Sequence, residues 1–154
     1  VIGADVLRGF VVDVSFAPCR VRLSRPGTAP PFQGATLPLV WLQGRPAAEA
    51  EVSDDIRAIR GRFVIATGAN APVRLADDIA QTPGAARPDE LYPQGVWLAR
   101  LPQVRFAGAV GRDVAAGLMK PDGDAAGVLG GAVLAHFRLR FDFPANRLVV
   151  QPAR

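Results

Sequence analysis

FVIATGANAPVRL, residues 63–75, begins with apolar side chains that lead into Ala66-Thr67-Gly68-Ala69 and ends in a second segment of alternating apolar residues. An apolar run that meets a Thr-Gly pair predicts a buried strand ending in a tight turn. Such a turn commonly presents one reactive side chain from the end of a rigid strand. The residue in that position here is Ala66, whose methyl group neither donates nor accepts a proton.

The composition is typical of a globular protein. The chain has 154 residues, enough for one well-buried core or for a domain plus a fragment, and is 49% hydrophobic and 21% charged. No apolar run approaches the roughly 18 residues of a membrane-spanning helix, so we expect no span in this chain. No signal pattern follows Val1, and we expect the chain to be a processed or truncated piece of a longer polypeptide.

Residues that bind transition metals are scarce. Cys19 is the only cysteine and His136 the only histidine, so the usual nitrogen and sulfur ligands of a metal site cannot be assembled within one chain. PDGD, residues 121–124, lacks the further carboxylates of a calcium loop and is typical of a turn. The sequence therefore predicts neither a metal site nor a cofactor.

Two further function classes are not expected. The net charge is +4, but the basic residues are scattered arginines with Lys120 as the only lysine, which disfavours nucleic-acid binding. The serines, Ser15, Ser24 and Ser53, lie outside any Gly-x-Ser-x-Gly motif, which disfavours a serine hydrolase of that type.

The strongest internal signal is a repeat. VIGADVLRGFVVDVSFAPCRVRLSR at residues 1–25 aligns without gaps to VLGGAVLAHFRLRFDFPANRLVVQP at residues 128–152. Seven positions are identical, and several of the others are apolar in both copies. Each copy predicts a glycine turn, a short helix and a two-stranded hairpin.

The sequence between the two copies predicts many short strands. Residues 24–34 are rich in Pro and Gly and are typical of a linker, and residues 36–52 predict two strands around a Gly44-Arg45-Pro46 turn. A polar connection or a short helical turn at 53–61 precedes the strand and turn of 62–69. Further strands are expected near 71–76, 96–108 and 112–119, with a short helix and a long loop at 77–95. We therefore expect a mostly-β fold, divided into a repeat remnant (1–25), a linker (26–36) and a domain (37–154).

Two motifs of the chain resemble those of a known family. VIATGA at residues 64–69 and VLGG at 128–131, the latter continuing into a helix and a terminal hairpin, resemble the retropepsin-like aspartic proteases. The resemblance covers about residues 37–152, and residues 1–25 match the end of the same pattern again. It implies an all-β acid protease barrel with one or two short helices, no cofactor, and a peptide or protein substrate. The family has its catalytic aspartate where this chain has Ala66.

The resemblance also implies roles for the neighbours of Ala66. In such enzymes two carboxylates, one from each of two similar lobes or subunits, share a water molecule, and one acts as acid while the other acts as base. Thr67 would hydrogen-bond across the interface between the lobes, and Gly68 would let the two backbones approach. Four further residues would support the turn: Ala69, Val128, Leu129 and Gly130.

Residues 81–97 would form a flap over the substrate, with Tyr92 or Trp97 in contact with it. Each of these assignments has a simpler alternative. Thr67-Gly68 taken alone is an ordinary strand-ending turn, and Tyr92 and Trp97 are equally consistent with core or rim aromatics. Asp77 and Asp78 are expected to cap a helix end, and Asp142 to lie on the solvent face of the terminal hairpin.

Two main functional hypotheses follow, and in a third the chain is a β-domain with a structural role only. In the first, the chain belongs to an aspartic endopeptidase that is inactive as written, because an engineered Ala66 replaces the catalytic aspartate. In the second, Ala66 is natural and the chain is a non-catalytic peptide-binding or regulatory module. In both, a second lobe from an upstream repeat or a homodimer partner would complete the groove. The composition, rich in Ala, Arg, Pro and Gly, favours a bacterial protein that is periplasmic or secreted.

Overall fold

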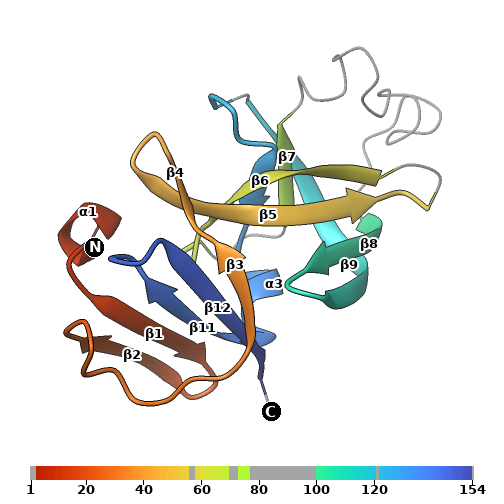
Figure 1. Cartoon of the computed structure of the whole chain (residues 1–154). Helices are drawn as coiled ribbons and strands as arrows, with labels where there is room; N and C mark the ends of the chain where they lie inside the picture. The colour runs from red at the N-terminus through yellow and green to blue at the C-terminus, as the bar shows by residue number, and fades with distance from the viewer. Residues whose placement is uncertain (1–2, 56–57, 70–72, 77–99, 121, 154) are drawn as a thin grey trace.

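The structure of the protein is a computed structural model, which describes residues 3–55, 58–69, 73–76, 100–120 and 122–153 (Figure 1). These residues form strands with two short helices, α1 (Ala4–Leu7) and α3 (Gly131–Leu134). The prediction of a mostly-β fold with one or two short helices is confirmed. No helix in the described part of the chain is long and apolar enough to cross a membrane.

One sheet joins the two ends of the described chain. Its strand order is β2-β1-β11-β12-β3, and every neighbouring pair in it is antiparallel. Its strands are β1 (Val11–Phe16), β2 (Cys19–Ser24), β3 (Ala35–Pro38), β11 (Phe137–Asp142) and β12 (Arg147–Pro152). The hairpin of the first repeat copy therefore lies directly beside the hairpin of the second copy.

The other sheet closes into a barrel. Its order is β4-β5-β6-β10-β7-β9-β8, and an additional pairing of β8 with β5 closes all of its strands except β4 into a ring. The strands are β4 (Val40–Leu42), β5 (Arg45–Ser53), β6 (Ala58–Ile65), β7 (Val73–Ala76), β8 (Arg100–Phe106), β9 (Ala109–Met119) and β10 (Gly127–Leu129). Closure leaves no free edge in the ring, which protects its backbone hydrogen bonds from water.

The main hydrophobic core lies between the barrel and the α3–β11–β12 end of the first sheet. Phe63 and Leu101 from the barrel and Leu134, Leu139 and Leu148 from the terminal helix and hairpin are almost fully buried in one cluster. Strand alternation produces this arrangement, because every second side chain of a strand points to the same face. The core fixes α3 and the terminal hairpin against the barrel.

Two local predictions need correction. The predicted turn at Gly44-Arg45-Pro46 lies one residue earlier, because Gln43 and Gly44 adopt the left-handed conformation (φ 49° and 77°) of a two-residue hairpin turn. Arg45 and Pro46 are instead paired residues of β5. The region 53–61 is also neither a connection throughout nor a helical turn throughout, since β6 already begins at Ala58. The helix and loop predicted for 77–95 lie outside the described residues.

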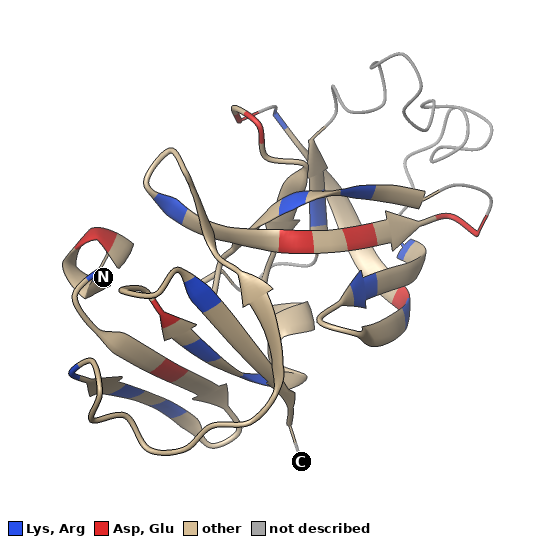
Figure 2. Cartoon of the chain, viewed as in Figure 1, with Lys and Arg blue, Asp and Glu red and all other residues tan. Residues whose placement is uncertain are grey.

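The charged residues are spread over both sheets, as Figure 2 shows. Most of the ion pairs are exposed, but Arg140 of β11 and Asp13 of β1 form a nearly buried one. Arg140 donates from Nε and Nη2 to the two carboxylate oxygens of Asp13 at 2.6 and 2.8 Å, and from Nη1 to the Pro30 carbonyl at 2.7 Å. The hydrogen bond with Asp13 raises the pKa of Arg140, so the guanidinium remains charged.

Candidate active site at the end of strand β6

The site is built on a strand inserted between two others. β6 and β7 are the strands on either side of the 66–72 segment, yet they do not pair with each other, because β10 lies between them. β10 runs parallel to β6, with Val128 opposite Val64, and antiparallel to β7, with Val128 opposite Arg74. The described turn that follows β6 therefore lies at the end of β10.

Backbone hydrogen bonds hold the turn that follows β6. The Ala66 N–H donates to the Leu129 carbonyl at 3.0 Å, and the Ala69 N–H donates back to the Ala66 carbonyl at 3.2 Å. The Gly131 N–H then donates to the Ala69 carbonyl at 2.7 Å. The turn is thus fixed at both ends to the segment that joins β10 to α3, so the position of residue 66 does not depend on a side chain.

The strand beneath the turn requires a glycine that the sequence analysis missed. A Cβ at Gly127 would lie 2.1 Å from the Arg74 carbonyl oxygen and 2.9 Å from a ring carbon of Phe63. Only glycine allows β10 to fit between β6 and β7 at this point. The sequence signal for it is its place: Gly127 directly precedes the VLGG motif of residues 128–131, which already contains two glycines.

Ala66, Thr67 and Ala69 are half-buried and Gly68 is exposed, so the turn faces outward from the barrel. A Cβ at Gly68 would meet nothing within 4 Å among the described residues. Its backbone needs no glycine for a left-handed conformation either. If glycine is required at this position, the reason is a contact from outside the described chain.

The structure brings together one group of the predicted site residues. Ala66, Ala69, Leu129 and Gly130 lie in or directly under the turn, and Val128 is paired between β6 and β7. Tyr92 and Trp97, together with Asp77 and Asp78, lie outside the described residues.

Asp142 of the terminal hairpin and Asp122 of PDGD already have partners. Asp142 accepts hydrogen bonds from the Arg147 guanidinium at 2.6 Å and from the Ala145 N–H at 3.2 Å. Asp122 pairs with Arg45. Among the described residues, no three His, Cys, Asp or Glu side chains come together as a metal site. The turn itself therefore supplies position and backbone groups, but Ala66 gives it no acid or base.

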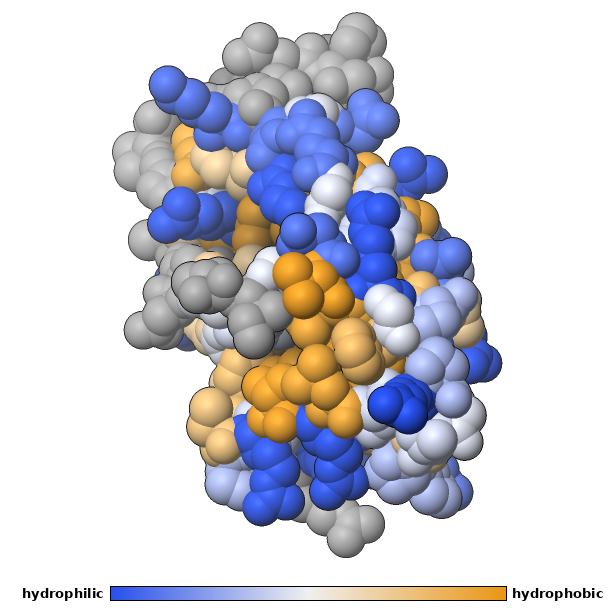
Figure 3. Space-filling view, turned by 90° about the vertical axis from the view of Figure 1, so that its left-hand side faces the viewer, coloured by the Kyte–Doolittle hydropathy of each residue, from blue (hydrophilic) through white to orange (hydrophobic). Residues whose placement is uncertain are grey.

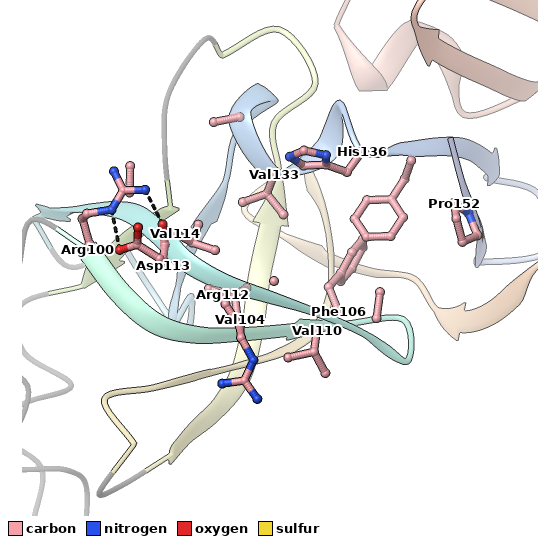
Figure 4. A pocket seen from close by; sticks show the side chains of 15 residues that line it. Arg100, Val104, Phe106, Val110, Arg112, Asp113, Val114, Val133, His136 and Pro152 are labelled. Carbon is pink, nitrogen blue, oxygen red and sulfur yellow. Dashed lines mark hydrogen bonds and ion pairs between the residues drawn. The ribbon is translucent and has the colours of Figure 1, made fainter. Parts of the chain in front are cut away.

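A separate pocket of about 610 Å³ lies between the β8–β9 hairpin and the α3–β11 corner (Figure 4). Its walls are mostly apolar, with Phe106, Val110 and Val133 among them, and His136 lies at its rim. Arg100 and Asp113 form an ion pair at its other end, with 2.5 Å between Nε and Oδ1. None of Ala66 to Ala69 lines it, so this pocket is distinct from the turn.

No family model matches the chain, and no curated protein matches it. Among solved structures, the chain is similar to the crystal structure of a retropepsin-like aspartic protease from Rickettsia conorii, with 18% sequence identity and a TM-score of 0.49. The similarity covers 79% of this chain and 96% of that chain.

Proposed function

We propose that the chain carries one half of the active site of a retropepsin-like aspartic endopeptidase, with Ala66 at the position of a catalytic aspartate. The observation that carries this proposal is the turn Ala66–Ala69, which one backbone hydrogen bond closes and two others fix to the β10–α3 segment. A rigid turn at the end of a buried strand holds a side chain at residue 66 in one position, and catalysis requires such a fixed geometry. The Thr67-Gly68 pair that follows is the sequence expected of such a turn.

The chemistry would require a carboxylate at residue 66 and a second one facing it. Two carboxylates that share one water molecule cannot both ionise, so one remains protonated. The ionised carboxylate removes a proton from the water as it attacks the peptide carbonyl, and the protonated one donates to the carbonyl oxygen. The carboxylate that took the water proton then gives it to the leaving nitrogen as the C–N bond breaks, and no covalent intermediate with the protein forms. With alanine at residue 66 the chain has neither proton acceptor nor donor there and is inactive.

The test restores the carboxylate. The variant Ala66→Asp, in a polypeptide that includes the region encoded upstream of residue 1, is expected to cleave peptides at acidic to neutral pH. Cleavage should be at least about 100-fold faster than with Ala66→Asn, which has a similar shape but no acid–base group. A hydroxyl inhibitor that mimics the tetrahedral transition state should abolish it. A folded Ala66→Asp protein without inhibitor-sensitive cleavage would refute the proposal.

A second candidate function is a non-catalytic peptide-binding module, and Ala66 itself favours it. Such a module would keep the turn and the groove but would have alanine in its native gene. Reading the native codon for residue 66 separates the two: an aspartate codon supports the endopeptidase, and an alanine codon supports the module. Calorimetric titration of the unmodified protein with extended peptides then tests the module directly, and no binding would refute it.

A further inference from the structure

The two copies of the sequence repeat have the same structure. α1, β1 and β2 of the first copy correspond to α3, β11 and β12 of the second. The alignment of residues 1–25 with 128–152 superimposes Ala4–Leu7 on Gly131–Leu134 without a shift, and the strand ends agree to within one residue. The same local unit therefore occurs twice in the five-stranded sheet.

The two units are related by a local two-fold axis. The repeat aligns Asp13 with Arg140, and the strand register pairs these same two residues. The register continues symmetrically on both sides, with Val12 opposite Phe141 and Val14 opposite Leu139. An antiparallel pairing in which a residue faces its own repeat counterpart is the arrangement of a two-fold axis through that pair.

Burial breaks this symmetry. Four large apolar residues of the first copy are 36–63% exposed, whereas their counterparts in the second copy are 0–8% exposed. The exposed residues are Val6, Phe10, Val21 and Leu23, and their buried counterparts are Val133, Phe137, Leu148 and Val150. We call the four exposed residues the open face. Only two other large apolar residues in the described part of the chain, Val110 and Leu118, are comparably exposed.

The second copy shows what covers such a face. Its counterparts all belong to the main core cluster, where they pack with barrel residues such as Phe63, Val73 and Leu101. In the described part of the chain no barrel lies over the first copy, and Figure 3 shows apolar side chains gathered on the side of the molecule where Figure 1 places α1 and the β1–β2 hairpin. Exposed apolar patches of this kind mark surfaces that bind another protein or lobe.

We propose that the open face closes the core of a second β-barrel lobe, which precedes α1 in the same polypeptide. The occupant must be a barrel without its own terminal helix and hairpin, because α1, β1 and β2 take their place. A second copy of this chain does not meet that requirement, since α3, β11 and β12 already close its barrel. The first strand of the upstream lobe would extend the sheet beyond β2, as β3 does beyond β12.

The same axis places a second turn opposite the first, and this part of the inference rests on the proposed function. Gly130 and Gly131, which lie under the turn of Ala66, have Gly3 and Ala4 as their counterparts. The equivalent turn of the upstream lobe would therefore sit over Gly3 and Ala4, on the other side of the axis. Gly68, whose outer side is open in this chain, would meet the backbone of that turn.

The first experiment compares one substitution in two proteins. In this chain alone, Val21→Asp should cost less than about 1 kcal/mol of unfolding free energy, because Val21 is exposed. In the polypeptide extended by the upstream region, the same change should strongly destabilise or prevent folding, as a buried charge does. Val110→Asp is the matched control, since Val110 is an exposed strand valine outside the repeat, and it should be tolerated in both proteins.

The second measurement requires no destabilised variant. Cys19 lies opposite Phe16 on the apolar side of β2 and is exposed, so iodoacetamide should label it rapidly in this chain. In the extended polypeptide, labelling of Cys19, followed by peptide mass spectrometry, should be at least tenfold slower.

Equal labelling in both proteins, or tolerance of Val21→Asp in both, would overturn the proposal. Protection of Cys19 in this chain alone, with a concentration-dependent dimer, would also overturn it and would assign the open face to a second copy. Neither readout uses catalysis, so a folded but inactive Ala66→Asp protein would refute the proposed function and leave this inference intact.

Discussion

At the scale of the residue, Gly127 and Gly68 show two opposite uses of glycine in one site. At Gly127 the main chain of β10 passes so close to β7 that a methyl group would overlap the Arg74 carbonyl oxygen. At Gly68 the same methyl group would meet none of the described residues within 4 Å. The first glycine builds the support of the turn, whereas the second is required, under our proposal, only by the missing lobe.

This difference predicts that the same substitution, glycine to alanine, lowers the stability of the chain at one position and leaves it almost unchanged at the other. Gly127→Ala should lower the free energy of unfolding of this chain by about 3 kcal/mol, because β10 has to move out from between its neighbours. Gly68→Ala should change it by less than about 0.5 kcal/mol. Urea unfolding followed by circular dichroism measures both. Equal stabilities of the two variants would contradict the close approach at Gly127.

At the scale of the element, the β1–β2 and β11–β12 hairpins are joined by the Asp13–Arg140 pair. Its side chains are only 18% and 11% exposed, and the contact is bidentate. The hydrogen bond with Asp13 raises the pKa of Arg140 in the folded protein, so while Asp13 is ionised the stabilisation is fully present below the pKa of an unfolded arginine. It would be lost only as the pH rises through the still higher folded pKa, so alkaline conditions near neutrality should not weaken it.

Arg140→Met, which keeps the length of the side chain, should cost about 3 kcal/mol by leaving Asp13 without its partner. The control is Arg147→Met, which breaks the more exposed pair with Asp142 and should cost less than about 1 kcal/mol. The exchange Asp13→Arg with Arg140→Asp should recover more than half of the loss, since the axis carries each residue to the place of the other. Chemical denaturation of the four proteins gives these values, and similar losses for Arg140→Met and Arg147→Met would contradict the argument.

At the scale of the whole molecule, one end of the five-stranded sheet is packed and the other is not. β11 and β12 cover the barrel core, whereas β2 is exposed along almost its whole length and is the last strand of the described sheet. Local stability follows burial and hydrogen bonding, so it should fall steadily from β11 to β2.

Hydrogen exchange measured by mass spectrometry should show this gradient. In this chain, amides of β2 should exchange at least roughly tenfold faster than those of β11, because β2 opens without disturbing the core. Uniform protection across the sheet would mean that something in this chain already covers β2.

The sequence predicted the local elements of this architecture but not all of the pairings between them. The strand at 62–65, the turn after it and the terminal helix and hairpin were recognisable, because their patterns are local. The position of β10 between β6 and β7 was not, because pairing partners distant in the chain leave no local pattern. Gly127 was missed for the same reason, since the Arg74 carbonyl that excludes a side chain there lies in another strand.

The repeat also concealed a distinction that only burial could reveal. Val21 and Leu148 look alike in the sequence, yet one is exposed and the other is fully buried. A hydrophobic residue in a strand pattern predicts a buried side chain, but it does not predict which part of the molecule packs against that side chain. The packing of each hairpin had to be seen in three dimensions.

The pair on the two-fold axis has an evolutionary consequence. Where two identical chains meet on such an axis, the central residue faces its own copy, so aspartate would meet aspartate and arginine would meet arginine. Like charges brought that close in a nearly buried site repel each other strongly. Aspartate can face arginine at this position only when the two hairpins have different sequences. The Asp13–Arg140 pair therefore suits two different hairpins of one chain, because two copies of either hairpin on this axis would bring like charges together.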